Sequence, residues 1–99
     1  MKIILITGAS GFIGKKLSSE LSKKYTVLKI SRSKKKDNYY TWKDLPTLEA
    51  DIVIHLSGKA HDKMNNNYEE YYKANVNQTE KIVDFCCKKK VSQLMFLQI

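Results

Sequence analysis

Three glycines stand at regular intervals after an apolar run near the amino terminus. The segment reads TGASGFIG, in which Gly8, Gly11 and Gly14 follow an isoleucine-rich stretch. Glycine is needed where a turn requires a positive φ, where a ligand approaches the backbone too closely for a Cβ, and where a helix packs tightly on a strand. Because the N-terminus of a helix presents unpaired N–H groups and favours negative charge, the segment predicts a pyrophosphate site. The alternative is a tight turn without a ligand.

The two histidines are the other residues that suggest chemistry. His55 ends an apolar run, and His61 follows it by six positions. No cluster of carboxylates at ligand spacing accompanies them, so we expect no metal site. His55 is predicted to be a hydrogen-bonded residue of the core.

Strands and helices must alternate around the glycines to position them. Apolar runs predict strands over residues 2–7, 25–31, 51–56 and 92–99, with a short strand over 39–41. Residues 33–38 are expected to form a charged loop, and the chain around Pro46 a poorly defined turn. Apolar strands joined by helices predict an α/β fold with a Rossmann-type, doubly wound parallel sheet.

Two helices are predicted, over residues 12–24 and 68–90. The first places Ile13, Leu17 and Leu21 on one stripe, with lysines free to face water. The stripe of the second helix is predicted to consist of Tyr72, Val76, Thr79, Val83 and Cys86. Both stripes are expected to pack against the sheet.

Composition limits the function classes. The 99 residues suffice for one small domain, and 18 Lys and Arg against 10 Asp and Glu give a net charge of +8. A basic surface attracts anions such as nucleotides, but the lysine runs lack interleaved aromatic residues or arginines, so nucleic acid is not expected. No run reaches the roughly 20 apolar residues of a membrane helix. The adjacent Cys86 and Cys87, without a secretory signal, favour a reducing cytoplasm.

Three motifs in order carry a family resemblance. They are the G-x-x-G-x-x-G spacing of TGASGFIG, DIVIHLSG at residues 51–58 and YYKANVNQT at residues 71–79. Together they resemble the extended branch of the short-chain dehydrogenase/reductase superfamily, the NAD(P)-dependent nucleotide-sugar epimerases, dehydratases and reductases. HLSGKAH at residues 55–61 is similar to the subgroup that handles UDP-hexosamines for surface polysaccharides. The resemblance covers residues 2–97.

The resemblance implies a set of cofactor-binding residues. The pyrophosphate would be bound by Gly8, Gly11, Phe12, Ile13 and Gly14. Ser57 and Gly58 would line the ribose side, Lys59 would reach the cofactor or substrate, and Asn75 would lie beside the cofactor. A solvated lysine remains the alternative for Lys59, and an ordinary polar helix position the alternative for Asn75.

The end of the second strand bears on the choice of cofactor. An NAD site usually has an acidic residue there to bond the ribose 2′-OH, whereas this chain has Ser31 and Arg32. An arginine tolerates a 2′-phosphate that a carboxylate would repel. The cofactor is therefore expected to be NADP or NAD, with NADP favoured.

The chain departs from the family at its catalytic residues. The resemblance implies a Ser or Thr after the fifth strand and a Tyr-x-x-x-Lys pair, but the fifth strand here reads FLQI. Two stretches with the pair's spacing, Tyr25 to Lys29 and Tyr39 to Lys43, lie too early, and about one match is expected by chance. We reject both.

We therefore expect residues 1–99 to form a partial NAD(P)-binding Rossmann domain, truncated after about the fifth strand. The catalytic residues and the substrate-binding domain would be absent, and a nucleotide-sugar would be a partner only in an intact relative. The alternative is a catalytically silent Rossmann-fold binding or interaction protein. In both cases an unpaired, apolar fifth strand is expected to favour self-association.

Overall fold

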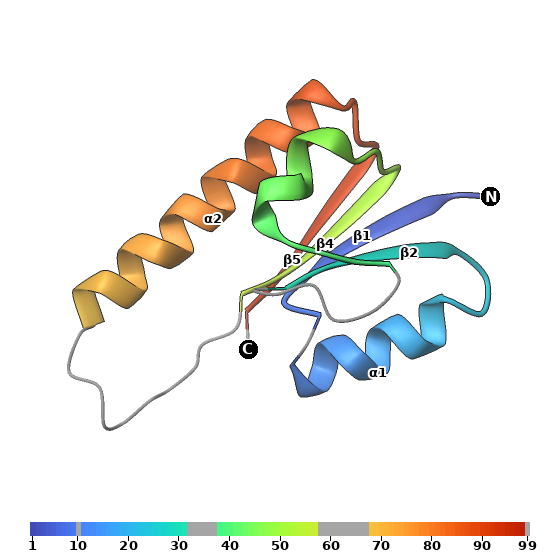
Figure 1. Ribbon diagram of the computed structural model, residues 1–99, viewed down its shortest axis with the longest axis horizontal. Coiled ribbons are helices and arrows are strands. Elements are labelled where there is room, and N and C mark those ends of the chain that lie inside the picture. The colour runs from blue at the N-terminus through green and yellow to red at the C-terminus, as the bar shows by residue number, and fades with distance from the viewer. Residues whose placement is uncertain (10, 32–37, 58–67, 99) are drawn as a thin grey trace.

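The computed structural model describes residues 1–9, 11–31, 38–57 and 68–98 (Figure 1). The elements, in chain order, are β1 (Ile3–Thr7), α1 (Phe12–Leu21), β2 (Thr26–Ile30), β3 (Tyr39–Tyr40), the 3-10 helix η1 (Trp42–Thr47), β4 (Ile52–Ser57), α2 (Tyr68–Lys88) and β5 (Gln93–Gln98). The five predicted strands and both predicted helices are therefore confirmed, with ends that differ by at most three residues.

The five strands form one parallel sheet in the order β3-β2-β1-β4-β5. From β1 the chain proceeds outward to β2 and β3, then crosses to the other side of β1 to form β4 and β5. The predicted Rossmann-type fold is confirmed. Ligands of such sheets bind at the carboxyl ends of the strands where the direction of winding changes, which here is between β1 and β4.

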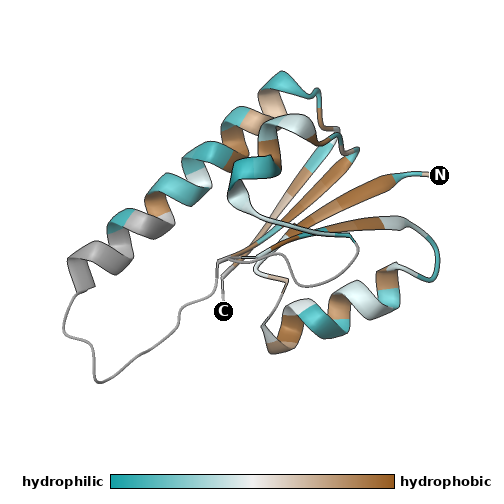
Figure 2. Cartoon of the chain, in the orientation of Figure 1, coloured by the Kyte–Doolittle hydropathy of each residue, from teal (hydrophilic) through white to brown (hydrophobic). Residues whose placement is uncertain are grey.

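Each face of the sheet is covered by its own layer (Figures 1 and 2). On one face α1 packs over a cluster that includes Ile4 and Ile6 of β1. On the other, α2 and η1 pack over a cluster that includes Leu5 of the same strand. Successive strand residues point to opposite faces, so the continuous apolar run of β1 is explained by burial from both sides.

The turn expected around Pro46 is the 3-10 helix η1, which corrects the prediction. The carboxylate of Asp44 accepts hydrogen bonds from the backbone N–H of Thr41 at 3.0 Å and from its hydroxyl at 3.2 Å. In return, the side-chain oxygen of Thr41 accepts a hydrogen bond from the backbone N–H of Asp44. This capping box starts the helix, and Leu45 then enters the core.

The contact face of α1 differs from the predicted stripe. Leu17 and Leu21 are half-buried as expected, but Ile13 is exposed and the buried positions are Gly14 and Ser18. The helix approaches through its small residues because Gly14 packs against the turn after β1. The helix also ends at Leu21 rather than residue 24, since the N–H groups of Lys24 and Tyr25 both turn back to the carbonyl of Leu21.

The predicted stripe of α2 is also partly wrong. Thr79 and Cys86 are half-buried, but Val76 and Val83 have exposed fractions of 40% and 46%. Among the helix residues whose burial is described, Ile82 and Phe85 are the most buried, and they pack with residues of β1, β4 and η1. Because η1 covers part of the same sheet face, α2 contacts the core on a side rotated away from Val76 and Val83. No helix in the described ranges is long and apolar enough to cross a membrane.

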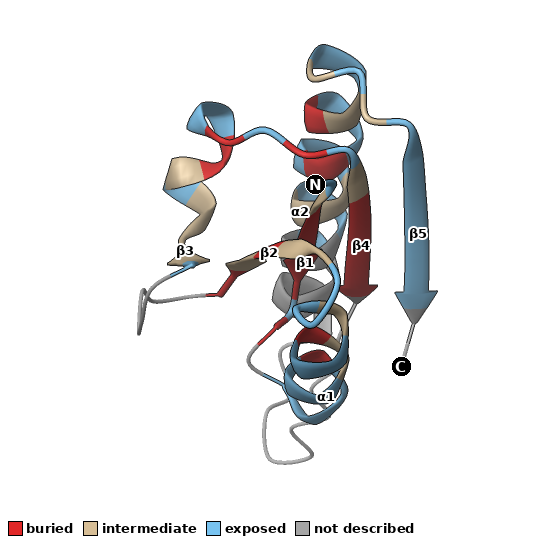
Figure 3. Cartoon of the chain, turned by 90° about the vertical axis from the view of Figure 1, so that its right-hand side faces the viewer, coloured by how far each residue is buried: buried red, intermediate tan, exposed pale blue. Residues whose placement is uncertain are grey.

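Strand β5 lies at the edge of the sheet and is largely exposed (Figure 3). It pairs with β4 along its length, from Gln93 beside Ile52 to Gln98 beside Ser57. Its four apolar residues, Leu94 to Leu97, have exposed fractions of 38–50%. The described chain thus presents an apolar edge strand without a second neighbour, as the sequence predicts.

Candidate functional site

The turn after β1 begins at Gly8, where the backbone conformation and the neighbouring strand together select glycine. Its φ is +69°, and a Cβ there would lie 2.7 Å from the carbonyl oxygen of Leu56 in β4. The left-handed backbone favours glycine, and the close contact with β4 leaves no room for a side chain. The turn therefore follows β1 at the switch point, pressed against the carboxyl end of β4.

Gly14, in the first turn of α1, has a different role. A Cβ at this position would collide with the carbonyl oxygen of Gly8 and would lie 2.7 Å from the Cα of Ala9. The missing side chain lets the helix pack directly on the turn. Two of the three glycines are thus explained by contacts within the protein.

Gly11 is the glycine that packing among the described residues does not require. It precedes α1 with φ −75° and ψ 173°, values that any residue adopts, and among the described residues a Cβ there would meet only the carbonyl oxygen of Gly8, at 3.6 Å. The residue is exposed. An exposed glycine at the start of a helix is what a ligand needs if it is to approach the backbone closely.

The first turn of α1 also leaves its N–H groups available. Gly11 provides no side-chain cap, and the first turn contains no acidic residue. Within the described ranges, no residue accepts a hydrogen bond from the N–H groups of Phe12, Ile13 or Gly14, and Lys15 makes the first bond, to the carbonyl of Gly11. These groups and the helix dipole fit a pyrophosphate. The side chain of Phe12 is 89% exposed at the same place.

A buried polar chain supports the neighbouring strand ends. His55 of β4 is 2% exposed, and its Nδ1 lies 2.5 Å from the hydroxyl oxygen of Thr7, the last residue of β1. Its Nε2 lies 3.1 Å from the hydroxyl of Thr79 in α2. The prediction of a hydrogen-bonded core histidine is confirmed. The three residues join β1, β4 and α2 beside the glycine turn.

The surroundings of the His55 ring are otherwise apolar. The rings of Trp42 and Phe96 meet it edge to face, with centroid distances of 6.5 Å and 5.3 Å. Burial lowers the pKa of His55 below its ordinary value because the charged form loses its hydration. We therefore assign His55 a structural role as a neutral ring that links the sheet to α2.

The structure describes only some of the other predicted cofactor-binding residues. Ser31 follows β2 and is buried, and its N–H donates to the carbonyl of Tyr40 at 2.9 Å. Ser57 is the last residue of β4, at the same edge of the sheet as the glycine turn, and Asn75 belongs to the first half of α2. Their predicted contacts with the cofactor stay predictions. Three further positions lie outside the described residues: Arg32, Gly58 and Lys59.

The rejected tyrosine–lysine pairs serve the fold. The ammonium of Lys29 lies 4.4 Å from the ring centroid of Tyr39, so the lysine stacks on a neighbouring strand rather than on Tyr25. Tyr25 and Tyr39 both pack against the core on the α1 side of the sheet. Lys43 lies in η1.

The sequence analysis did not identify Thr7 and Thr79 as the partners of His55. The signal that could have found them was the predicted burial of His55, because a buried histidine needs hydrogen-bond partners.

The parallel sheet, the switch point and the uncapped helix after a glycine turn define a Rossmann-type dinucleotide-binding unit. Residues 4–98 match the sequence model of the NAD dependent epimerase/dehydratase family, and the chain belongs to that family. The resemblance predicted from the three motifs is confirmed, and with it the nicotinamide dinucleotide as the cofactor of the family.

Individual relatives are longer than this chain. A sterol-4-alpha-carboxylate 3-dehydrogenase (decarboxylating) of Dictyostelium discoideum is 29% identical over 110 residues, which cover 95% of this chain and 33% of the relative. UDP-N-acetylglucosamine 4-epimerase from Bacillus cereus superposes with a TM-score of 0.75 at 21% identity, covering 97% of this chain and 36% of that one. A hypothetical dTDP-4-dehydrorhamnose reductase from Sulfolobus tokodaii gives 0.72 at 30% identity, covering 94% and 37%. The chain thus spans about a third of each.

Replacing Gly11 with serine is expected to weaken cofactor binding without lowering the free energy of unfolding. In Gly11→Ser, the hydroxyl caps the N-terminus of α1 and raises or preserves the free energy of unfolding, with a gain of at most about 1 kcal/mol. The same side chain occupies the space and the N–H groups of the pyrophosphate, so affinity for NADP falls at least about tenfold. Urea unfolding and calorimetric titration measure the two effects.

The matched control is Gly14→Ala, in which the added Cβ meets backbone atoms. This variant loses about 1–3 kcal/mol of stability through overpacking. If Gly11→Ser bound NADP as tightly as the parent chain, Gly11 would not mark the pyrophosphate site.

The buried histidine predicts how stability depends on pH. The unfolded chain takes up a proton on His55 near pH 6.5, while the folded chain resists it because burial lowers the pKa. The unfolding free energy is therefore fully retained above that value and falls as the pH drops below it, by at most about 1.4 kcal/mol per pH unit. Urea unfolding between pH 8 and pH 5.5 tests this.

His55→Gln should remove that slope, whereas His61→Gln, which alters the chain's other histidine, should keep it. The opposite pattern would show that the proton-linked loss of stability does not arise at the buried ring.

Proposed function

We propose that this chain binds NADP or NAD through the glycine turn and supplies the cofactor-binding part of a nucleotide-sugar epimerase-like protein. The observation that carries the proposal is Gly11, an exposed glycine before a helix without a side-chain cap, at the switch point of the sheet. Contacts within the fold require Gly8 and Gly14, whereas no contact with a described residue requires Gly11, and a closely approaching ligand would. When bound, the nicotinamide would supply hydride transfer.

The proposed substrate of the assembled enzyme is a UDP-hexosamine, used in the synthesis of surface polysaccharide. HLSGKAH at residues 55–61 supports this through its resemblance to that subgroup. The structural likeness to a UDP-N-acetylglucosamine 4-epimerase is consistent with it. The family's Tyr-x-x-x-Lys pair follows the fifth strand, so the reaction would need groups that come after β5.

The proposed preference is for NADP. Ser31 closes β2 and is buried, which leaves the adjacent Arg32 as the charged residue at this strand end. A guanidinium attracts the 2′-phosphate of NADP, and no carboxylate at positions 31–32 would bond the 2′-OH of NAD. The preference therefore depends on the charge at position 32.

Calorimetric titration with NADP and then NAD tests the proposed function. We expect saturable binding of both, with NADP bound more tightly. Arg32→Asp should reverse that preference by about tenfold or more, because a carboxylate repels the 2′-phosphate and bonds the 2′-OH. Lys24→Asp, with the same change in charge on an exposed turn, should leave the preference unchanged.

A folded sample that binds neither nucleotide would contradict the proposed cofactor function. Binding with equal affinity for NADP and NAD would contradict only the preference.

The exposed edge strand supports a second candidate function, that of a catalytically silent interaction protein. Strand β5 has no charged residue to discourage pairing, and its apolar residues are 38–50% exposed. An open edge of this kind can pair with a strand of a second copy. Val76 and Val83 of α2 add further exposed apolar surface.

Self-association through β5 predicts an average mass, measured by light scattering, that rises with protein concentration. Leu97→Lys should lower the mass toward that of the monomer, because a lysine on an edge strand resists pairing. Asn77→Lys, which adds the same charge on an exposed part of α2, should not. A monodisperse monomer in the parent chain would contradict this second function.

A cytoplasmic location is proposed on the state of the cysteines. Cys86 and Cys87 are both free thiols, half-buried and exposed respectively. Burial and the neighbouring Cys87 raise the pKa of Cys86, which keeps its thiol protonated and unreactive. Adjacent free thiols are typical of reducing compartments.

A further inference from the structure

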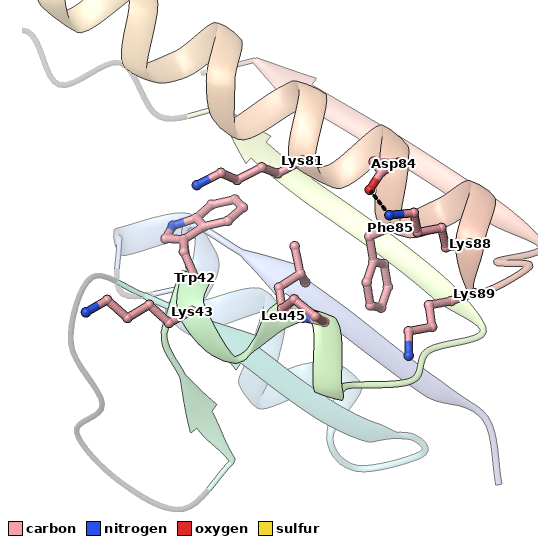
Figure 4. A pocket seen from close by; sticks show the side chains of 9 residues that line it. Trp42, Lys43, Leu45, Lys81, Asp84, Phe85, Lys88 and Lys89 are labelled. Atoms are coloured by element: carbon pink, nitrogen blue, oxygen red, sulfur yellow. Dashed lines mark ion pairs between the residues drawn. The ribbon is translucent and has the colours of Figure 1, made fainter.

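A pocket between η1 and α2 lies outside the proposed dinucleotide site (Figure 4). Its volume of about 530 Å³ falls within the range of small-molecule sites, roughly 300–1,000 Å³. Its walls come from two segments far apart in the sequence, the 3-10 helix after β3 and the second half of α2. The same elements cover one face of the sheet.

The inner surface of the pocket is apolar and partly aromatic. Leu45 and Phe85 are buried members of the core cluster, and the half-buried Trp42 packs against the same cluster. The Trp42 ring therefore contacts the core cluster and also lines the pocket. Such a surface favours a flat, apolar group that can stack on the indole.

The rim of the pocket is strongly cationic. Four of the lining residues are lysines and one is an aspartate. Lys88 pairs with Asp84 at 3.1 Å, and Lys89 pairs with Glu49 at 2.8 Å. The other two, Lys43 and Lys81, form no ion pair with any described residue. Figure 4 shows Lys81 reaching from α2 toward the Trp42 ring, whereas Lys43 extends from η1 away from the pocket.

We propose that this pocket binds a small aromatic anion, with the ring against Trp42 and the acidic group at Lys81. The apolar surface disfavours a purely inorganic anion, and the lysines disfavour an aromatic cation. A ligand with both parts uses both features, since Lys81 can donate to a carboxylate or phosphate oxygen.

The pocket and the N-terminus of α1 belong to opposite faces of the sheet. The pocket is on the face covered by α2, whereas α1 covers the other face. The Lys89 end of the pocket extends toward the amino ends of the strands, because Lys89 reaches Glu49, which precedes β4. The Trp42 end lies toward the carboxyl ends, since Trp42 follows β3 and its ring meets that of His55. The sheet itself therefore separates a ligand at Trp42 from the dinucleotide, and the two should bind without competing.

Trp42 provides a specific reporter because it is the only tryptophan of the chain. Titration of the full chain with 1-naphthyl phosphate should shift the single indole N–H resonance and give a saturable calorimetric curve. Lys81→Ala should weaken binding about tenfold through loss of a charged donor. Lys24→Ala, an exposed lysine elsewhere, should leave the affinity unchanged, as should saturation with NADP.

Four results would overturn the proposal. Equal affinity for inorganic phosphate and 1-naphthyl phosphate would show that the lysines attract any anion and that the aromatic surface does not contribute to binding. Equal losses in Lys81→Ala and Lys24→Ala would do the same. Displacement of 1-naphthyl phosphate by NADP would assign the binding to the dinucleotide site. Trp42→Phe keeps an aromatic surface and should retain binding in calorimetry, so a complete loss of binding in this variant, while it remains folded, would also count against the proposal.

Discussion

The close approach of the turn after β1 to the end of β4 is the contact on which the rest of the site depends. Gly8 lies against the carbonyl of Leu56 in a left-handed conformation that only glycine adopts readily. That conformation turns the chain so that α1 starts above the sheet, and Gly14 then fits against the same turn. The N-terminus of α1 is thus aimed at the switch point by two contacts that tolerate no side chain. Gly11, between them, is left exposed for a ligand.

The strands on either side of this point are held at both ends. At the amino ends, the N–H of Ile3 donates to the carboxylate of Asp51 at 2.8 Å, and the N–H of Ser92 donates to the carbonyl of Asp51 at 2.9 Å. At the carboxyl ends, His55 joins Thr7 to Thr79. These bonds fix β1, β4, β5 and α2 relative to one another. Both ends of the two central strands are thus tied to their neighbours, while β5 presents an open edge.

Most of the fold could be predicted because the dominant signals are local. The buried strands have continuous apolar runs, and the three glycines mark the turn. The contact faces of the helices could not be predicted from periodicity, because they depend on tertiary neighbours: Gly14 draws the small side of α1 to the turn, and η1 shifts the face of α2 away from Val83. The 3-10 helix had a readable signal in Thr41 and Asp44, a capping box that the proline beside it obscured. The roles of Ser57 and Asn75 rest on contacts with a ligand, which the fold alone does not determine.

The central claim is that the N–H groups at the start of α1 bind a pyrophosphate. The most direct test is a residue-resolved NMR titration of the isotope-labelled chain with NADP, followed through backbone amide resonances. The account predicts that the largest shifts occur at the amides of Gly11 to Gly14, with smaller changes along α2. If the shifts instead centred on the lysine run at residues 88–90, while the amides of the glycine turn stayed in place, the nucleotide would be held by surface charge and the account would be wrong.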